Sequence, residues 1–152
     1  MTQTQYPVVL EVKATEKGLQ VQATTSIDRA LKDAKSLQAH LRCIEVDYKT
    51  TLAAAREALG STGRGRFRDP RAFWFAGKYL TEFIVRLESH GFYLVEKNIT
   101  PAKHLGISRA SVEKMMAFYG RYPDPFKIDI SVPWTLYRDN KEPRPNPAPR
   151  QG

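Results

Sequence analysis

The residues best suited to chemistry in this chain lie at positions 108 to 114, and the chemistry they suit is recognition of a nucleic acid. The guanidinium of Arg109 can donate paired hydrogen bonds to guanine, and the methyl group of Ala110 can contact thymine. Lys114 can hold a phosphate, with Ser108 and Ser111 completing the candidate set. Such side chains read bases when a helix carries them into the major groove.

The surrounding sequence, NITPAKHLGISRASVEKMMAF at 98–118, has the spacing of a helix-turn-helix. The first helix needs a small residue facing its partner, which is Ala102, and the turn needs a residue that tolerates positive φ, which is Gly106. Ser108 is the expected cap of the second helix, and Val112 and Met115 are expected to point inward. The residues then expected to face outward are Arg109, Ala110, Ser111, Glu113 and Lys114.

Pro101 lies where the first helix of such a pair is usually already formed. We therefore expect this helix to begin with Thr100 as its cap and to be little more than one turn long. Lys103, on the same short helix, is a further candidate for contact with DNA. The alternative is an ordinary pair of core helices, since similar spacings arise by chance.

A second candidate set lies in the Gly/Arg loop at 60–69. Arg64, Arg66 and Arg68 alternate there with glycines that let the backbone approach a ligand, and guanidinium groups bind phosphate with paired donors. The spacing is not that of a nucleotide-binding P-loop, so nucleotide hydrolysis is not predicted. A solvated linker is the alternative.

Positive charge is concentrated in the same part of the chain. The 152 residues include 24 basic and 16 acidic side chains, for a net charge of +8, and residues 60–123 hold 11 basic and 5 acidic of these. A localised positive field is typical of proteins that bind polyanions. A basic surface that serves solubility is the alternative.

Two alternating stretches predict a β-hairpin at 1–25. Its apolar face should pack on helices or on a second copy, because an isolated hairpin is marginal in water. Glu11 and Lys13 form the ExK half of a PDDEXK nuclease site, but no acidic residue precedes Glu11, so two solvent-facing charges are the favoured interpretation. The apolar positions of the hairpin are Val8, Leu10, Val12, Ala14, Leu19, Val21 and Ala23.

Residues 26–59 contain neither glycine nor proline and predict one long helix, with Ser26 as its cap. Its apolar positions follow a seven-residue repeat, but several of them are alanine or threonine. The stripe can pack on other helices of this chain or form a coiled coil, and either arrangement can support a homodimer. The stripe comprises Ile27, Ala30, Ala34, Leu37, Leu41, Ile44, Tyr48, Thr51, Ala55 and Ala58.

The helix-turn-helix domain is expected to span residues 70–140. Asp69 followed by Pro70 is a helix-start signal, so we expect the domain to begin with a helix that runs towards Gly91. Its aromatic residues are expected in the core rather than as base-stacking platforms. Pro133 can open a last short helix, and the proline-rich residues 141–152 are expected to be a disordered tail. The expected core residues are Phe73, Trp74, Leu80, Phe83, Ile84 and Leu87, followed by Phe126, Ile128, Ile130, Trp134 and Leu136 in a segment that folds back.

Several other classes of protein are not expected. No stretch approaches the roughly 18 to 20 apolar residues that span a bilayer, and the first residues do not form a signal peptide, so a cytoplasmic location is expected. Cys43 is the only cysteine and the three histidines lack metal-ligand spacing, so neither a disulfide nor a metal site is predicted. No catalytic residues and no cofactor are predicted, and we expect a protein that is not an enzyme.

The run from FWFAGKYL through LGISRASVEKMMAFYGRYP to SVPWTLYRDN resembles the helical N-terminal domain of the YhcG family of PDDEXK nucleases. The resemblance covers about residues 72–140 and implies nucleic-acid binding and protein association. No nuclease module follows in this sequence, so no cleavage activity is implied. The residues that carry the resemblance are Trp74, Gly77, Gly106, Phe118, Tyr119, Pro123, Trp134 and Tyr137.

These patterns predict a mainly α protein with an N-terminal hairpin, one long helix and a helix-turn-helix domain. The favoured function is non-enzymatic binding of double-stranded DNA by a homodimer, as in a transcription regulator or an accessory factor of a mobile element. One alternative is a structural or assembly protein that oligomerises through the long helix without a nucleic-acid role. Another is a nuclease that a partner completes around Glu11 and Lys13.

Overall fold

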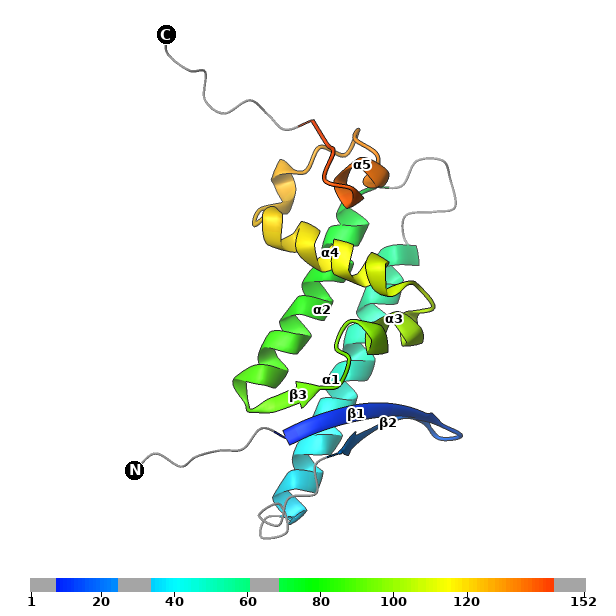
Figure 1. The fold of residues 1–152 in the computed structure, drawn as a ribbon, viewed down its shortest axis with the longest axis vertical. Coiled ribbons are helices and arrows are strands. Elements are labelled where there is room, and N and C mark those ends of the chain that lie inside the picture. The colour runs from blue at the N-terminus through cyan, green and yellow to red at the C-terminus, as the bar shows by residue number, and fades with distance from the viewer. Residues whose placement is uncertain (1–7, 25–33, 61–68, 144–152) are drawn as a thin grey trace, which may run out of the picture.

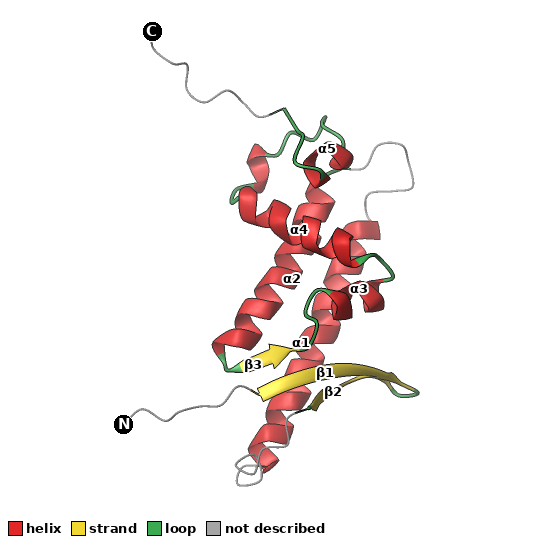
Figure 2. Cartoon of the chain, in the orientation of Figure 1, coloured by secondary structure: helices red, strands yellow, loops and turns green. Residues whose placement is uncertain are grey.

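The computed structural model describes residues 8–24, 34–60 and 69–143. These residues are mainly helical, with a small sheet towards the N-terminus, so the predicted fold class is confirmed (Figures 1 and 2). None of the described helices has both the length and the apolar composition needed to cross a membrane. In chain order the elements are β1 (Val8–Thr15), β2 (Gly18–Ala23), α1 (Ala34–Gly60), α2 (Arg71–Ser89), β3 (Phe92–Leu94), α3 (Ile99–Leu105), α4 (Arg109–Arg121), the 3₁₀ turn η2 (Pro125–Lys127) and α5 (Trp134–Arg138).

The N-terminal hairpin forms as the alternating pattern predicts. β1 and β2 pair antiparallel, with Val12 opposite Val21 and Leu10 opposite Ala23, so the apolar positions of both strands share one face. Gly18 adopts a φ of 104° at the turn, a conformation that favours glycine. Leu10 and Val21 are buried in a cluster with residues of α1 and α2, so the apolar face packs on helices of the same chain.

The sequence pattern predicts two strands, whereas the described residues contain a third. β3 pairs parallel with β1, with Val8 opposite Phe92 and Leu10 opposite Leu94. The chain reaches β3 through Gly91, whose φ of 83° turns it out of α2 and whose carbonyl accepts a hydrogen bond from the Val8 N–H at 3.0 Å. Three residues are too few for an alternating pattern to be recognised in a sequence.

α1 packs along α2 (Figure 1), and buried residues of its apolar stripe contact this neighbour. Leu41, Tyr48 and Leu52 are buried in one cluster with Phe83 and Ile84 of α2. Of the two arrangements that the sequence left open for this stripe, packing within the chain is the one the structure shows. The expected cap and the first stripe positions, Ser26, Ile27 and Ala30, lie outside the described residues.

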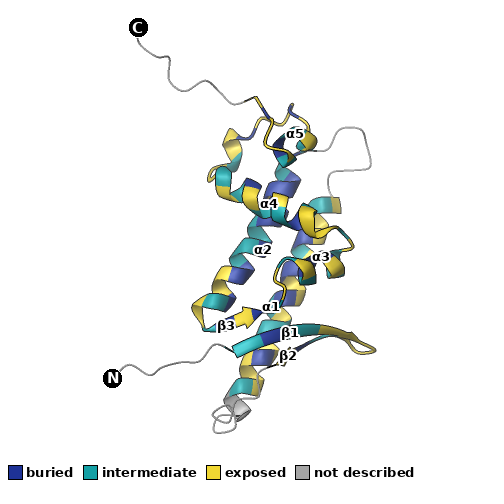
Figure 3. Cartoon of the chain, viewed as in Figure 1, coloured by how far each residue is buried: buried dark blue, intermediate teal, exposed yellow. Residues whose placement is uncertain are grey.

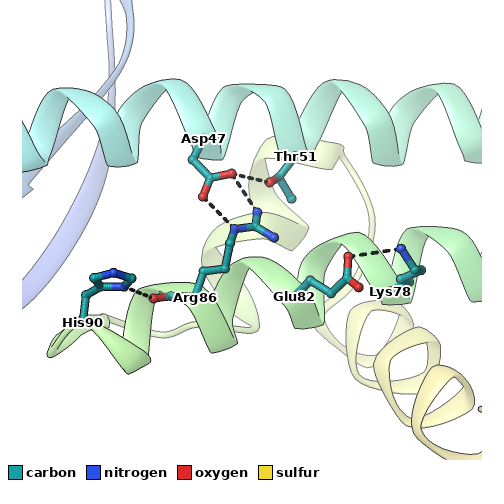
Figure 4. Close-up of polar contacts among 6 residues, drawn as sticks. All are labelled: Asp47, Thr51, Lys78, Glu82, Arg86 and His90. Carbon is teal, nitrogen blue, oxygen red and sulfur yellow. Dashed lines mark hydrogen bonds and ion pairs between the residues drawn. The ribbon is translucent and has the colours of Figure 1, made fainter.

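An ion pair joins α1 and α2 beside this apolar contact (Figure 4). Arg86 donates from Nη2 and Nε to the two carboxylate oxygens of Asp47, at 2.7 and 3.0 Å. The hydroxyl of Thr51, one turn further along α1, donates to the same carboxylate at 3.4 Å. Arg86 and Asp47 both remain partly exposed, so the pair mainly fixes the alignment of the two helices.

A second core holds α2 against α4 and α5. The indole of Trp74 is buried and its Nε1 donates to the carbonyl oxygen of Tyr122 at 2.6 Å. Phe118 is fully buried in the same cluster, and α2 and α4 cross at Gly77, next to the backbone of Met115. The core positions predicted for α2, namely Phe73, Trp74, Leu80, Phe83, Ile84 and Leu87, are all buried.

The segment that follows α4 folds back onto the core, but not all of its predicted core residues are buried. Ile128 is buried and Pro133 precedes α5, but Phe126 is 89% exposed and Ile130 is 47% exposed, so the prediction that these two belong to the core is wrong. For Phe126 the physical reason is the 3₁₀ turn at η2. Asp124 caps this turn by accepting a hydrogen bond from the Phe126 N–H at 2.9 Å, which leaves the phenyl ring outside the apolar cluster.

The expectation that residues 141–152 bury almost nothing is wrong at the start of this range. Glu142 is buried, and Tyr122 donates its hydroxyl hydrogen to the Glu142 carboxylate at 2.6 Å. Burial, together with this hydrogen bond, raises the pKa of Tyr122 to about 12. Arg121 also lies 3.9 Å from the same carboxylate, so Glu142 is held at the C-terminal end of α4. Residues 144–152 lie outside the described part.

Candidate nucleic-acid interface

α3 begins earlier than the sequence predicts, with Asn98 rather than Thr100 in the cap position. Glu96 has a positive φ of 49°, and its carbonyl oxygen accepts the backbone N–H groups of Ile99 and Thr100. Pro101 is therefore the third helical residue, where no intrahelical donor is required. The proline is compatible with the first turn, and α3 reaches seven residues.

The turn between α3 and α4 has the predicted geometry. Gly106 adopts a φ of 73°, and the N–H of Ile107 donates to the Ala102 carbonyl oxygen at 3.0 Å, which closes the last turn of α3. Ser108 then caps α4, because its Oγ accepts the N–H of Ser111 at 3.0 Å. Ala102 is buried, as its position facing α4 requires.

One face of α4 is anchored in the core and the other is open. Val112 and Met115 are 0% and 1% exposed, as the helix-turn-helix pattern predicts. Ser111 differs from the prediction, because it is half-buried and its hydroxyl lies 2.9 Å from the Ser108 hydroxyl, where it serves the cap. The candidate residues that are exposed are Lys103, Ser108, Arg109, Ala110 and Lys114. Figure 3 shows the start of α4 as exposed.

Arg109 is exposed and engaged with a neighbouring carboxylate. Its Nε donates to Glu113 at 2.9 Å, and the side-chain amide of Asn98 donates to the same oxygen at 3.2 Å. The hydrogen bond from Arg109 is the main cause that holds the pKa of Glu113 below its ordinary value. The pair has the i,i+4 spacing of a helix-surface ion pair. A base contact by Arg109 would have to replace or share this hydrogen bond.

Lys103 and Lys114 are the exposed cations of this pair of helices that form no ion pair with the residues the structure describes. Lys114 is one of the smaller causes that hold the pKa values of Glu113 and Asp139 below their ordinary values, and the main causes are hydrogen bonds from Arg109 and Arg138. These two lysines therefore keep most of their charge available for a phosphate. The basic residues between 69 and 123 that do form ion pairs are Arg71, Lys78, Arg86, Lys97, Arg109 and Arg121.

The Gly/Arg candidates, Arg64, Arg66 and Arg68, lie outside the described residues. Segment 60–123 has 11 basic and 5 acidic side chains, an excess of six positive charges. Residues 69–123 alone have 8 basic and 5 acidic side chains, an excess of three, so these three arginines supply the other half. The positive field of the described interface is therefore smaller than the composition of the whole segment suggests.

The sequence pattern does not predict the contacts that join α1 to α3. Arg56 Nη2 donates to the His104 carbonyl oxygen at 2.6 Å, and the Tyr48 hydroxyl lies 2.7 Å from His104 Nδ1. Helical periodicity places Tyr48 in an apolar stripe and Arg56 on the surface of the helix. It cannot show that both residues contact His104, about 50 residues later in the chain. These hydrogen bonds fix α3, and with it the turn before α4, against the long helix.

The Tyr48–His104 contact favours a neutral imidazole. Burial, followed by the charges of Lys103 and Arg56, holds the pKa of His104 below its ordinary value. Burial raises the pKa of Tyr48, so the phenol keeps its proton. A neutral imidazole can accept that proton at Nδ1, whereas a protonated ring can only donate there.

We therefore expect mild acid to weaken the fold through His104. The folded-state pKa of His104 lies below the unfolded value of about 6.5. The stabilisation that the neutral imidazole contributes is therefore complete above about pH 6.5, and it is lost as the pH falls through the folded-state pKa. Urea unfolding at about pH 7.5 and about pH 5 measures the loss. His104→Asn should lose less stability on acidification than the wild type. Equal acid sensitivity of the wild type and His104→Asn would contradict this assignment.

Glu11 and Lys13 form an ion pair on the surface of β1. The Lys13 Nζ lies 3.3 Å from Glu11 Oε1, and the two side chains are 55% and 39% exposed. This matches the expectation of two solvent-facing charges. No group of three or more metal-ligating side chains occurs within residues 8–24, 34–60 and 69–143, so the described chain supplies no ligand set around them.

Comparison with protein-family models, with curated proteins and with solved structures found no match to this chain. Its functional assignment accordingly depends on the geometry and charge of its own residues.

Proposed function

We propose that this protein is a non-enzymatic, cytoplasmic protein that binds double-stranded DNA through α3 and α4. The observation that supports this most strongly is the position of the first turn of α4. It follows the left-handed turn at Gly106 and leaves Arg109 and Ala110 exposed, while Val112 and Met115 on the opposite face are buried. A helix that is anchored on one face and open on the other can enter a major groove as a rigid unit.

The roles of the residues follow from their exposure and their partners. Arg109 and Ala110 face base edges, and Arg109 exchanges its hydrogen bond to Glu113 for one to guanine. Lys103 and Lys114, from α3 and α4, contact phosphates and set the position of α4 on the duplex. On sequence alone, the Gly/Arg loop adds phosphate contacts that carry no sequence preference.

Homodimerisation is part of the same proposal, but the apolar stripe of α1 is covered by α2. A second copy would therefore contact outer positions such as Val46 of α1 or Val85 of α2, which are 63% and 60% exposed. A two-fold dimer would present two copies of α4 to half-sites about 34 Å apart. Light scattering distinguishes such a dimer from the 17.3 kDa monomer.

The competing function, a structural or assembly protein without a nucleic-acid role, depended mainly on the same stripe as an oligomerisation seam. Because this stripe packs within the chain, no observation in the described residues favours that function over DNA binding. A large oligomer that is insensitive to salt and does not bind DNA would support it.

The proposal predicts duplex binding that weakens steeply with salt. Fluorescence anisotropy with a labelled duplex of mixed sequence, measured between about 50 and 200 mM salt, should give a log–log slope of about −3 to −5 if four or five phosphate contacts form. Selection of bound oligonucleotides at both salt concentrations then separates sequence-specific binding from phosphate attraction. Absence of duplex binding at the lower salt concentration would refute the proposed function.

A further inference from the structure

A hollow of about 490 Å³ lies where the C-terminal end of α1, the turn before α4 and helix α5 meet. Its size falls within the range of roughly 300 to 1,000 Å³ that is typical of sites for small organic ligands. Ile107 and Ser111 border it from the turn and from α4, whereas Arg109, Ala110 and Lys114 do not line it. The hollow is thus distinct from the exposed residues assigned to DNA.

Two aromatic residues that line the hollow stack on each other. Phe73 of α2 and Trp134 of α5 stack with 4.3 Å between ring centroids and 4° between ring planes. Both residues line the hollow, and Leu59 and Met115 extend its apolar lining. A lining of this kind favours the planar, apolar body of an aromatic ligand.

Two arginines from different helices line the same hollow. Arg138, on α5, pairs through Nε and Nη2 with Asp139 at 3.0 and 3.1 Å, so its charge is already balanced. Arg56, on α1, donates from Nη2 to a backbone carbonyl, that of His104, which does not neutralise it. A guanidinium carries five N–H donors in a planar fork that matches a carboxylate, so this contact leaves donors for an anionic ligand.

We propose that this hollow binds a small aromatic carboxylate, with its ring system against Phe73 and Trp134 and its carboxylate at Arg56. The apolar lining accounts for the ring, and the unbalanced charge of Arg56 accounts for the anionic group.

Isothermal titration of the full chain with 2-naphthoate tests this site without any DNA. A ligand of this size in a pocket of ordinary quality binds with a dissociation constant of about 1 mM or below. The neutral analogue 2-naphthalenemethanol has the same ring system without the charge and should bind at least about tenfold more weakly. This comparison uses the wild-type protein, so it does not depend on the folding of a variant.

A matched pair of variants then assigns the charge to one residue. Arg56→Gln should weaken 2-naphthoate at least about tenfold and change the affinity for the alcohol by less than about threefold. Arg42→Gln removes an exposed arginine of the same helix that does not line the hollow, and it should bind both compounds like the wild type. Equal affinity for the acid and the alcohol, unchanged binding of the acid to Arg56→Gln, or no saturable binding below about 10 mM would each overturn the proposal. None of these results depends on whether the protein binds a duplex.

Discussion

Replacing Gly77 by alanine is expected to destabilise the protein by about 3 kcal/mol or more, a large part of the stability of an ordinary domain. A Cβ at this position would overlap the carbonyl group of Met115 in α4, and the backbone of Met116 lies next to it. Backbone atoms cannot rotate aside as the end of a flexible side chain can, so the crossing of α2 and α4 would have to open. Urea unfolding of the wild type and the variant measures the loss.

Gly120 provides the matched control for this substitution. It lies within α4, and a Cβ added there would meet no atom within 4 Å. Gly120→Ala should therefore stabilise the protein by about 0.5 to 1 kcal/mol, because alanine is the better helix former. If Gly77→Ala were as stable as Gly120→Ala, the close crossing of α2 and α4 would be wrong.

The Gly77 crossing also matters for the proposed interface. It lies on the buried side of α4, so it determines how far the exposed first turn stands out from α2. The structure gives Gly77 a steric role in this chain. That role would exist in any pair of helices that cross so closely, and it does not by itself indicate DNA binding.

Local patterns predicted much of this fold, because local physics determines those parts. The pairing of Val12 with Val21 follows from two alternating stretches and a glycine turn, and the positive φ of Gly106 follows from the end of a short helix. The cap at Ser108 is likewise determined within four residues. Each of these features depends on side chains that are close together in the sequence.

Features that depend on distant parts of the chain could not be predicted in the same way. β3 exists because β1 offers a free edge beside Phe92, and Glu142 is buried because Tyr122 supplies a donor. The exposure of Phe126 results from a 3₁₀ turn capped by Asp124, which overrides the apolar character of the residue. Hydrophobicity alone does not contain this information.

The candidate site shows the same division. The exposure of Arg109, Ala110 and Lys114 follows from helical periodicity, whereas the contact of Arg56 with the His104 carbonyl does not. The Arg109–Glu113 pair could have been predicted from i,i+4 spacing alone, and it changes the expected behaviour of Arg109. Recognition by this arginine requires that it leave or share a partner, whereas the two lysines are already open to phosphate.

Reversing the charge of these two lysines should therefore have the largest effect on DNA binding. The double variant Lys103→Glu/Lys114→Glu removes two phosphate contacts and places two carboxylates beside the duplex, and we expect affinity at about 50 mM salt to fall by about 100-fold or more. The log–log slope with salt should become shallower by about 2, because each lost phosphate contact removes about one unit. Fluorescence anisotropy measures both quantities, and the loss should be equal for all duplex sequences.

The control for this double variant is a pair of lysines on the N-terminal hairpin. Lys13→Glu/Lys17→Glu makes the same change in net charge on the hairpin, where both lysines are exposed and neither belongs to the proposed interface. It should reduce affinity only through the lower net charge of the protein, by less than about tenfold, and leave the salt slope nearly unchanged. Equal losses for the two double variants would show that the protein attracts DNA by its overall charge. In that case α3 and α4 would not form the binding surface, even though the protein binds a duplex.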